Sequence, residues 1–520
     1  MQKWAPAIDG KLFPGNQVNY LIDGPATYQA MFNSLQSVMK DDARGYYIYL
    51  LGWWLDSKMP LVTGDNSSSL WEMLKRASAR GVQIRVMLWQ NVLESLYKDF
   101  YGGDSAKQQV RSINMLSGAA ALLDDTSAVP FQAHHQKLLL IRGRGGLSAF
   151  CGGLDIAWDR IITQKKHSGS PMHDVHCQIE GPGARGLVDV FKQRWSAHPM
   201  AASIEKQEKL RCGRDSFPGP NDGKGPGNAQ VAILRTYLDT SRHCIQEQSI
   251  RTSLRKMIGA AKRYIYVEDQ YMTNLECATL LGQALGHVQY VFFLVAPSEL
   301  SDLPGVWRAR RAFLDAVKQA APKTKADNFR VFFKLGAKSY GVAPKRSLPF
   351  PQYQPDDWPT ADDLGPHCYV HSKTWIFDDE VAVIGSANCN RRGWYFDSEV
   401  AAVIMDVSPI LNRGSYSFAY ELRVALWSEH LGVDPSKVRD WKMGGELWAS
   451  EGLRPFLPGS KKNDGPWVRY YRDRADRDPQ LVTGGFDTTE PEVRGIDFKS
   501  AIDQIADLSR NELKACQRPG

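Results

Sequence analysis

HSKTWIFD at residues 371–378 and GSAN at residues 385–388 form the most informative segment of the chain. A second copy of this pattern lies earlier, as HQKLLLIR at residues 135–142 and GGLD at residues 152–155. In each copy a histidine and a lysine stand two residues apart at the start of an apolar strand, so strand alternation places both on one face. A face that carries an imidazole and an ammonium is a poor core face and suits an anion such as phosphate.

The segments around the two copies repeat in the same order, which indicates an internal duplication. In the first half we expect helix 27–42, strand 46–55, a capped helix 67–81 and strand 82–89. In the second half we expect helix 250–263, strand 264–271, helix 278–285, strand 288–296, helix 307–320 and strand 329–335. Helices that alternate with apolar strands predict an α/β fold, with helices packed on a largely parallel or mixed sheet.

Composition indicates where the two halves begin and end. Residues 204–228 are dense in Gly, Pro, Asn and Asp, so we expect a linker or surface loop there. This linker separates an N-terminal half at residues 1–203 from a C-terminal half at residues 229–440. Residues 441–520 are predicted to be a loop-rich extension with one helix at 498–514.

The bulk numbers describe an ordinary globular chain of 520 residues with a formal charge of +7. Basic and acidic residues are interspersed without dense Lys/Arg clusters, so no nucleic-acid partner is expected. No run approaches the roughly 20 apolar residues that span a bilayer. Residues 1–10 lack the apolar core of a Sec signal, so we expect synthesis in the cytoplasm without one. The eight cysteines include no CxxC pair, which predicts buried thiols, such as Cys151, Cys177 and Cys389, rather than a disulfide or zinc framework.

Residues 371–378 match the HxKxxxxD motif of the phospholipase D superfamily in full, with its GSxN downstream, and the chain resembles that superfamily. The first copy matches the HxK part and a GGxD variant of the same turn. Other segments that resemble the family are HDVH at 173–176, EGP at 180–182, QRW at 193–195, EDQY at 268–271, DSE at 397–399 and the closing helix at 422–432. The resemblance covers residues 20–435. It implies a pseudo-twofold, duplicated α-β-α sandwich with one active site between the halves.

The resemblance also implies a set of catalytic residues drawn from both halves: His135, Lys137, Asp174, His371, Lys373, Asn388 and Glu399. One histidine attacks phosphorus to form a phosphohistidine, and the other protonates the leaving alcohol and then activates water. The lysines neutralise the phosphate oxygens, to which Asn388 and Ser386 can donate hydrogen bonds. The acceptors that hold the histidines are Glu399 for the second half and Asp174 for the first. Ser386, Asp155 and Asp378 are expected on the substrate side, and no metal or other cofactor is needed.

The sequence departs from the family pattern at one position. Arg142 stands where the first copy should carry its closing Asp. In the family that Asp is mainly structural, so we expect activity to survive. The alternative is a catalytically weakened homologue that binds phosphate or lipid. Two further choices stay open: Asp155 can line the pocket or merely close its turn, and either histidine can be the nucleophile, although we favour His135.

Other polar and aromatic candidates lack a duplicated context. We expect His134, His167, His173 and His176 to be structural. Trp53-Trp54 is interpreted as a packed strand end rather than as a membrane-contacting edge.

We expect hydrolysis of a glycerophospholipid to phosphatidic acid and a head-group alcohol, with the phospholipid membrane surface as partner. The alternative is a cardiolipin synthase-like phosphatidyl transfer, because an alcohol can capture the same intermediate as water; a nuclease is a weaker alternative. Head-group preference is expected to depend on loops near 165–173 and 340–367, the latter an irregular stretch typical of a binding loop or lid.

A bacterial phospholipase active in its own cytosol would threaten the membrane of the cell that makes it. The hypothesis is therefore an effector delivered by type VI secretion to the periplasm of a target cell. This hypothesis brings two further expected partners, an immunity protein and a component of the secretion apparatus.

Overall fold

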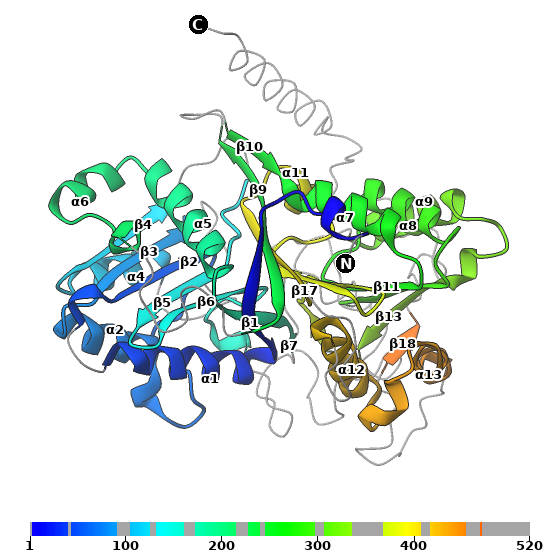
Figure 1. Cartoon of the computed structure of the whole chain (residues 1–520), viewed down its shortest axis with the longest axis horizontal. Coiled ribbons are helices and arrows are strands. Elements are labelled where there is room, and N and C mark those ends of the chain that lie inside the picture. The colour runs from blue at the N-terminus through cyan, green and yellow to red at the C-terminus, as the bar shows by residue number, and fades with distance from the viewer. Residues whose placement is uncertain are drawn as a thin grey trace, which may run out of the picture.

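A computed structural model describes residues 3–39, 43–90, 105–124, 132–160, 172–214, 227–239, 245–296, 306–334, 368–406, 417–453 and 468–470. One mixed sheet runs across both halves of the molecule, with the first half in blue and cyan and the second in green to orange (Figure 1). Its strand order is β18-β13-β12-β11-β15-β16-β17-β9-β1-β8-β6-β5-β2-β3-β4, and β10 pairs with β9.

The sheet has two equivalent series of strands, which start at the neighbouring strands β1 and β9 and run outward in opposite directions. The first-half strands are β1 Leu12–Ile22, β8 Val175–Glu180, β6 Gly146–Gly152, β5 Leu138–Gly143, β2 Tyr47–Gly52, β3 Gln83–Trp89 and β4 Ala119–Asp124. Their counterparts are β9 Ala229–Asp239, β17 Glu399–Asp406, β16 Val381–Gly385, β15 Thr374–Phe377, β11 Tyr264–Asp269, β12 Tyr290–Val295 and β13 Phe329–Lys334. The last three strands of each series are parallel, and the others are antiparallel. The predicted duplicated α/β fold is therefore confirmed.

Helices cover both faces of this sheet because its inner strands are apolar on both sides. In β2, Tyr49 belongs to one core and Leu50 to another; in β11, Tyr266 and Val267 divide in the same way. The first-half helices are α1 Asp23–Gln36, α2 Leu70–Ala79, α4 Ala106–Asn114, α5 Ala184–Ala197 and α6 Ala201–Gln207. The second-half helices are α7 Ser249–Ala260, α8 Leu275–Ala284, α9 Val306–Ala320, α11 Arg391–Tyr395, α12 Phe418–Leu431 and α13 Trp441–Leu453. Within the described residues, no helix combines the length and apolarity needed to cross a bilayer.

The predicted helix at 67–81 shows how local signals fix an element. The Ser69 side chain accepts from the Glu72 backbone N–H and caps α2. Gly81 follows the helix with a φ of 79°, a left-handed conformation that favours glycine. The segment therefore forms the expected capped helix, three residues shorter at its start and two at its end.

The ends of the two halves differ from the prediction. Trp4, near the N-terminus, belongs to the core of the second half and lies 5.9 Å from the Phe377 ring, between ring centroids. Residues 204–207 belong to α6, and 215–226 lie outside the described residues. Beyond residue 440 the chain forms α13 and then β18, Val468–Tyr470, which pairs with β13. The expected helix at 498–514 lies outside the described residues.

Candidate active site

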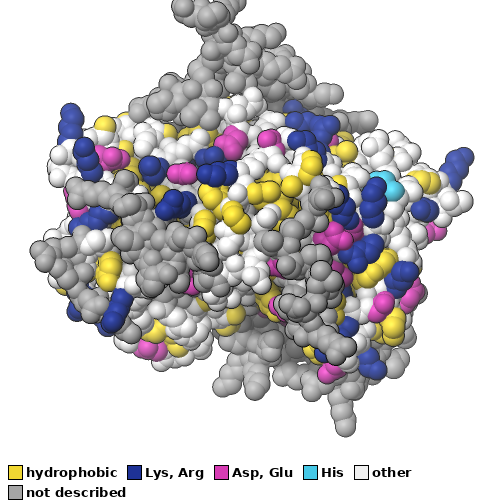
Figure 2. Space-filling model, in the orientation of Figure 1, with side chains coloured by type: hydrophobic (Ala, Val, Ile, Leu, Met, Phe, Trp, Pro, Cys, Tyr) yellow, Lys and Arg dark blue, Asp and Glu magenta, His cyan; other side chains and the backbone are white. Residues whose placement is uncertain are grey.

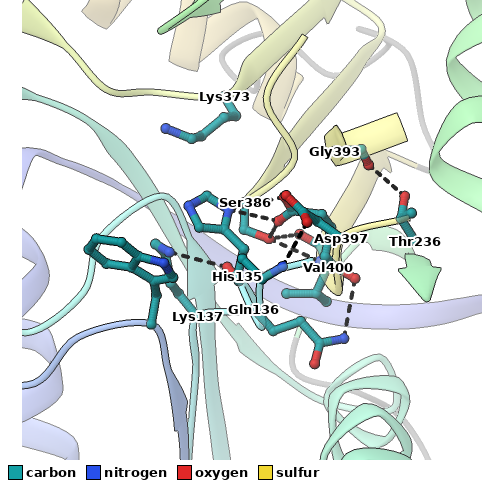
Figure 3. Close-up of polar contacts among 12 residues, drawn as sticks. His135, Gln136, Lys137, Thr236, Lys373, Ser386, Gly393, Asp397 and Val400 are labelled. Carbon is teal, nitrogen blue, oxygen red and sulfur yellow. Dashed lines mark hydrogen bonds and ion pairs between the residues drawn. The ribbon is translucent and has the colours of Figure 1, made fainter. Parts of the chain in front are cut away.

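His135 lies where the first half meets the second. Its backbone N–H donates to the Ser398 carbonyl at 2.9 Å, next to a short parallel bridge between His134 and Ser398. Its ring Nδ1 lies 3.0 Å from both oxygens of Glu399, the first residue of β17 (Figure 3). Because a carboxylate only accepts, Nδ1 carries the proton and Nε2 keeps a free lone pair.

His371 has the matching environment on the opposite side of the pseudo-twofold axis. It follows β14, Tyr369–Val370, which pairs in parallel with β7, Met172–His173. Its backbone N–H donates to the His173 carbonyl at 2.8 Å. Its Nδ1 donates to Asp174 Oδ2 at 2.6 Å, which again leaves Nε2 free for chemistry.

These contacts correct the predicted assignment of the acceptors. Glu399 holds His135 of the first half, and Asp174 holds His371 of the second, so the pairing within each half was wrong. Each HxK segment lies beside the carboxylate-bearing segment of the other half, which brings that carboxylate within reach. Neither half can therefore form an oriented histidine alone.

The two lysines lie close to the histidines and are about 2% exposed. Lys137 pairs with Asp155 at 3.1 Å, and Lys373 donates to Gln270 Oε1 at 3.3 Å. Figure 3 shows the Lys373 side chain directed to the side of the His135 ring on which Lys137 lies. Burial and the charges of both lysines hold the pKa of His135 well below its usual range. Burial, followed by the charge of Lys373, does the same for the pKa of His371, so both rings are neutral.

Some of the remaining predicted residues belong to the pocket, and others hold the catalytic side chains in place. The Ser386 hydroxyl donates to Glu399 at 2.5 Å and so supports that carboxylate. Asn388 is buried, and its Oδ1 has no hydrogen-bond partner among the described residues. Asp155 Oδ1 accepts from the backbone N–H groups of Trp53 and Trp54, and Oδ2 forms the ion pair with Lys137, so Asp155 positions a lysine and closes the turn.

Asp378 was wrongly expected on the substrate side. Its carboxylate accepts from three consecutive backbone N–H groups, at residues 262–264, and pairs with Lys3 at 2.8 Å. It stands five residues after Lys373, a separation of about 16 Å along an extended strand. The matching Arg142 lies on β5 opposite Tyr47, again at the end of the strand away from its histidine.

Replacing Asp378 with alanine is expected to lower the free energy of unfolding by about 3 kcal/mol, because three backbone donors lose their acceptor. The folded variant should keep kcat within about twofold of wild type, since the site is remote. Urea unfolding and head-group release on the folded fraction measure the two quantities. A large loss of kcat in fully folded protein would return Asp378 to the active site.

Several residues of the site were not predicted. The Trp53 ring lies edge-on to His135, at 6.4 Å between centroids, and stacks on Trp89. Arg160 is buried and adds positive charge near His371 and Lys373. An aromatic strand end was visible in the sequence, but nothing local marked Arg160. The loop residues 165–171 and 340–367 lie outside the described residues.

A close approach explains the glycine pair of the first copy. A Cβ on Gly153 would lie 2.1 Å from Asp174 Oδ1, and one on Gly152 would lie 2.5 Å from His176 Nδ1. Both distances are far below van der Waals contact, so only glycine lets Asp174 occupy its place beside His371.

The charges of the site predict a bell-shaped pH dependence for kcat/KM. Burial, only partly opposed by Lys373 and Arg160, raises the pKa of Asp174 to about 6. As pH falls through that value the carboxylate is protonated and His371 loses its acceptor. Burial lowers the pKa of Lys373 to about 8, so its charge is lost as pH rises through that value. Burial also raises the pKa of Glu399 well above its usual range, so protonation of that carboxyl contributes to the acid limb as well. Rates with a short-chain lipid should therefore fall as pH drops toward 6 and as it rises beyond 8; a flat profile across pH 6 would contradict this role of Asp174.

A family model described as Phospholipase D matches residues 310–443. Phospholipase D alpha 2 of Oryza sativa subsp. japonica is 23% identical over 546 residues, covering 80% of this chain and 67% of the relative. Phospholipase D A of Dictyostelium discoideum is 23% identical over 471 residues, covering 75% of this chain and 34% of the relative. Among solved structures, phosphatidylserine synthase of Haemophilus influenzae superposes with a TM-score of 0.48 at 12% identity, covering 78% of this chain and 86% of that one.

The duplicated sheet and its two carboxylate-held histidines define a phosphodiesterase-type enzyme with one site shared between two halves. The matches to the family model and to the phospholipases D support a place for this chain in the phospholipase D superfamily.

Proposed function

We propose that the protein hydrolyses the head-group phosphodiester of glycerophospholipids, yielding phosphatidic acid and an alcohol. The observation that carries this proposal is the crossed pairing of His135 with Glu399 and of His371 with Asp174, beside two buried lysines. The free Nε2 of each ring is the atom that can attack phosphorus or transfer a proton. Lys137 and Lys373 supply the positive charge that an anionic phosphodiester needs before it can be attacked.

The reaction divides into two balanced steps. His135, the more exposed of the two rings, attacks phosphorus through Nε2; a P–N bond forms and the P–O bond to the head group breaks. The bound phosphate offsets the lysine charges, which lets His371 carry the proton that it gives to the departing alcohol. In the second step water transfers a proton to His371 and its oxygen binds phosphorus, which breaks the P–N bond.

The lipid substrate class is supported by the names of the relatives and by the surface charge. Figure 2 shows basic and acidic side chains interspersed over one face, a distribution unlike the continuous basic track that nucleic-acid binding favours. We therefore propose a phospholipid membrane surface, and not a nucleic acid, as the partner.

Release of choline or ethanolamine from phosphatidylcholine and phosphatidylethanolamine vesicles tests the proposal. Wild type should release the head group and His371→Ala should not, while Lys437→Ala, a substitution on the short turn after α12, should match wild type. Equal, negligible release by wild type and His371→Ala would favour a lipid-binding homologue. Conversion of phosphatidylglycerol to cardiolipin without phosphatidic acid would favour the transfer reaction.

We also propose that the protein is an effector delivered by type VI secretion to a target-cell periplasm, with an immunity protein in the producer. The support is chemical, because an enzyme that cleaves membrane phospholipids is harmful wherever it meets a membrane. Expression with a periplasmic signal should arrest growth, and His371→Ala should be harmless. Normal growth with active protein in the periplasm would reject this proposal.

A further inference from the structure

A buried chain of polar contacts lies directly behind His371 and joins the two halves. Its members are Asp23 at the start of α1, His173 on β7, Glu268 on β11, His430 on α12 and Lys334 at the end of β13. The first two belong to the first half and the last three to the second. The side chains of His173, Glu268 and His430 are at most 1% exposed.

The partners of His173 fix its protonation. Nδ1 lies 2.9 Å from Asp23 Oδ1, and Nε2 lies 3.0 Å from Glu268 Oε2. Carboxylates only accept, so both ring nitrogens carry a proton and the ring is an imidazolium. Burial opposes this charge, but the carboxylates of Glu268 and Asp23 outweigh it and raise the pKa of His173 to about 10.

His430 has the opposite protonation state, again fixed by its neighbours. Its Nδ1 lies 2.9 Å from the Lys334 ammonium, which only donates, so Nδ1 accepts. Its Nε2 then carries the single proton and donates to Glu268 Oε1 at 2.9 Å. Burial, followed by the charge of Lys334, lowers the pKa of His430 to about 4, which agrees with a neutral ring.

The ligand atoms of His173, Glu268 and His430 are close enough to one another to bind a metal ion. A metal on Nε2 of His430 would require a proton on Nδ1, and that proton would face the Lys334 ammonium. Two hydrogen-bond donors would then face each other in a buried place, which costs free energy. The proton positions assigned above for His173 and His430 instead give each contact one donor and one acceptor.

We propose that His173 is a positioning residue for the reaction, a permanently charged imidazolium that holds Asp174 and, through it, His371. This rests on the proposed function of the site. Asp23 Oδ1 accepts from both His173 Nδ1 and the Asp174 backbone N–H, at 2.9 and 3.1 Å. The His173 carbonyl accepts from the His371 backbone N–H at 2.8 Å. The charge of His173 also favours the ionised form of Asp174, the form that accepts from His371.

The other half-site has a permanent cation in the corresponding place. Ser398 precedes Glu399 as His173 precedes Asp174, and its hydroxyl accepts from Arg194 Nη1 at 3.0 Å. Arg194, on α5, also pairs with Asp124. The residue before each catalytic carboxylate therefore either contacts or carries a buried positive charge. Ser398 contacts the Arg194 guanidinium, and His173 is itself an imidazolium.

The charged and titratable groups that face His173 come from four elements. They are Asp23 from α1, Glu268 from β11, the His430 ring at 4.6 Å between centroids together with Glu429 from α12, and the adjacent Asp174. Lys334 offsets Glu429, with which it pairs at 2.5 Å. The carboxylates of Asp23 and Glu268, which contact the ring, favour its charged form, so it stays charged through the working range of pH.

His173→Gln keeps a hydrogen-bond donor and removes the charge. We expect kcat to fall about 10- to 100-fold, with KM changed far less, because only the placement of the acid-base group is impaired. The acid limb of kcat/KM should move to higher pH, since Asp174 loses a nearby positive charge. The matched control is Arg423→Gln, which removes a buried cation of α12 paired with Asp379. It should lower the melting temperature and leave the acid limb in place. An unmoved acid limb in His173→Gln would overturn the proposal.

Nitrogen-15 NMR of histidine-labelled protein tests the charge without any lipid. His173, identified by the signals lost in His173→Gln and shifted in Asp23→Asn, should show two protonated ring nitrogens from pH 6 to about 8.5. A neutral ring would overturn the proposal, as would one tightly bound metal ion per wild-type chain that His173→Gln loses. If wild type releases no head group from vesicles, the proposed function fails while this measurement still decides the state of His173.

Discussion

Replacing His135 with alanine is expected to abolish lipid turnover, with a loss in kcat of about 10⁵-fold, because the nucleophile is removed. A phosphatidyl ester of p-nitrophenol makes the test sharp, since this leaving group departs without a proton. His135→Ala should release no burst of nitrophenolate. The variant should fold, because the ring is partly exposed and its Nδ1 contacts the Glu399 side chain.

His371→Ala should behave differently with the same substrate. Attack by His135 needs no general acid here, so one nitrophenolate per chain should be released before turnover stops. The covalent adduct should then be found by mass spectrometry on the peptide that contains His135. A burst from His135→Ala, or an adduct on the peptide with His371, would reverse the two roles.

The duplicated fold could be predicted because its signals are local. The apolar runs at Tyr47–Gly52 and Tyr264–Asp269 became inner strands, buried along their whole length. Strand β1 was not predicted, since Leu12–Ile22 contains proline, glycine and polar residues and is only partly buried. Its place is set by distant partners, because it pairs with β8 of one half and β9 of the other.

The candidate site could be predicted only in part, for a similar reason. Alternation along a strand places His371 and Lys373 together, and the same holds for His135 and Lys137. Which carboxylate meets which histidine depends on how the two halves meet, and no spacing along the chain contains that information. Burial of Arg160 beside His371 is likewise a property of the assembled fold.

The crossed pairing of carboxylates and histidines makes the second large prediction. Glu399→Gln and Asp174→Asn should each lower kcat for a natural lipid by about 10⁴-fold, the size of loss seen when a carboxylate that orients a catalytic histidine becomes an amide. An amide can donate to Nδ1, which favours the tautomer with the proton on Nε2 and blocks the reacting nitrogen. Steady-state head-group release measures these losses but does not separate the two residues.

The p-nitrophenyl substrate does separate them. Because Glu399 holds His135, Glu399→Gln should lose the burst, as His135→Ala does. Because Asp174 holds His371, Asp174→Asn should keep a full burst and fail afterwards, when His371 must activate water. Pairing within each half would produce the opposite result, with the burst lost in Asp174→Asn and kept in Glu399→Gln. The burst experiment therefore distinguishes crossed pairing from pairing within each half, since in the described part of the chain Glu399 contacts His135 and Asp174 contacts His371.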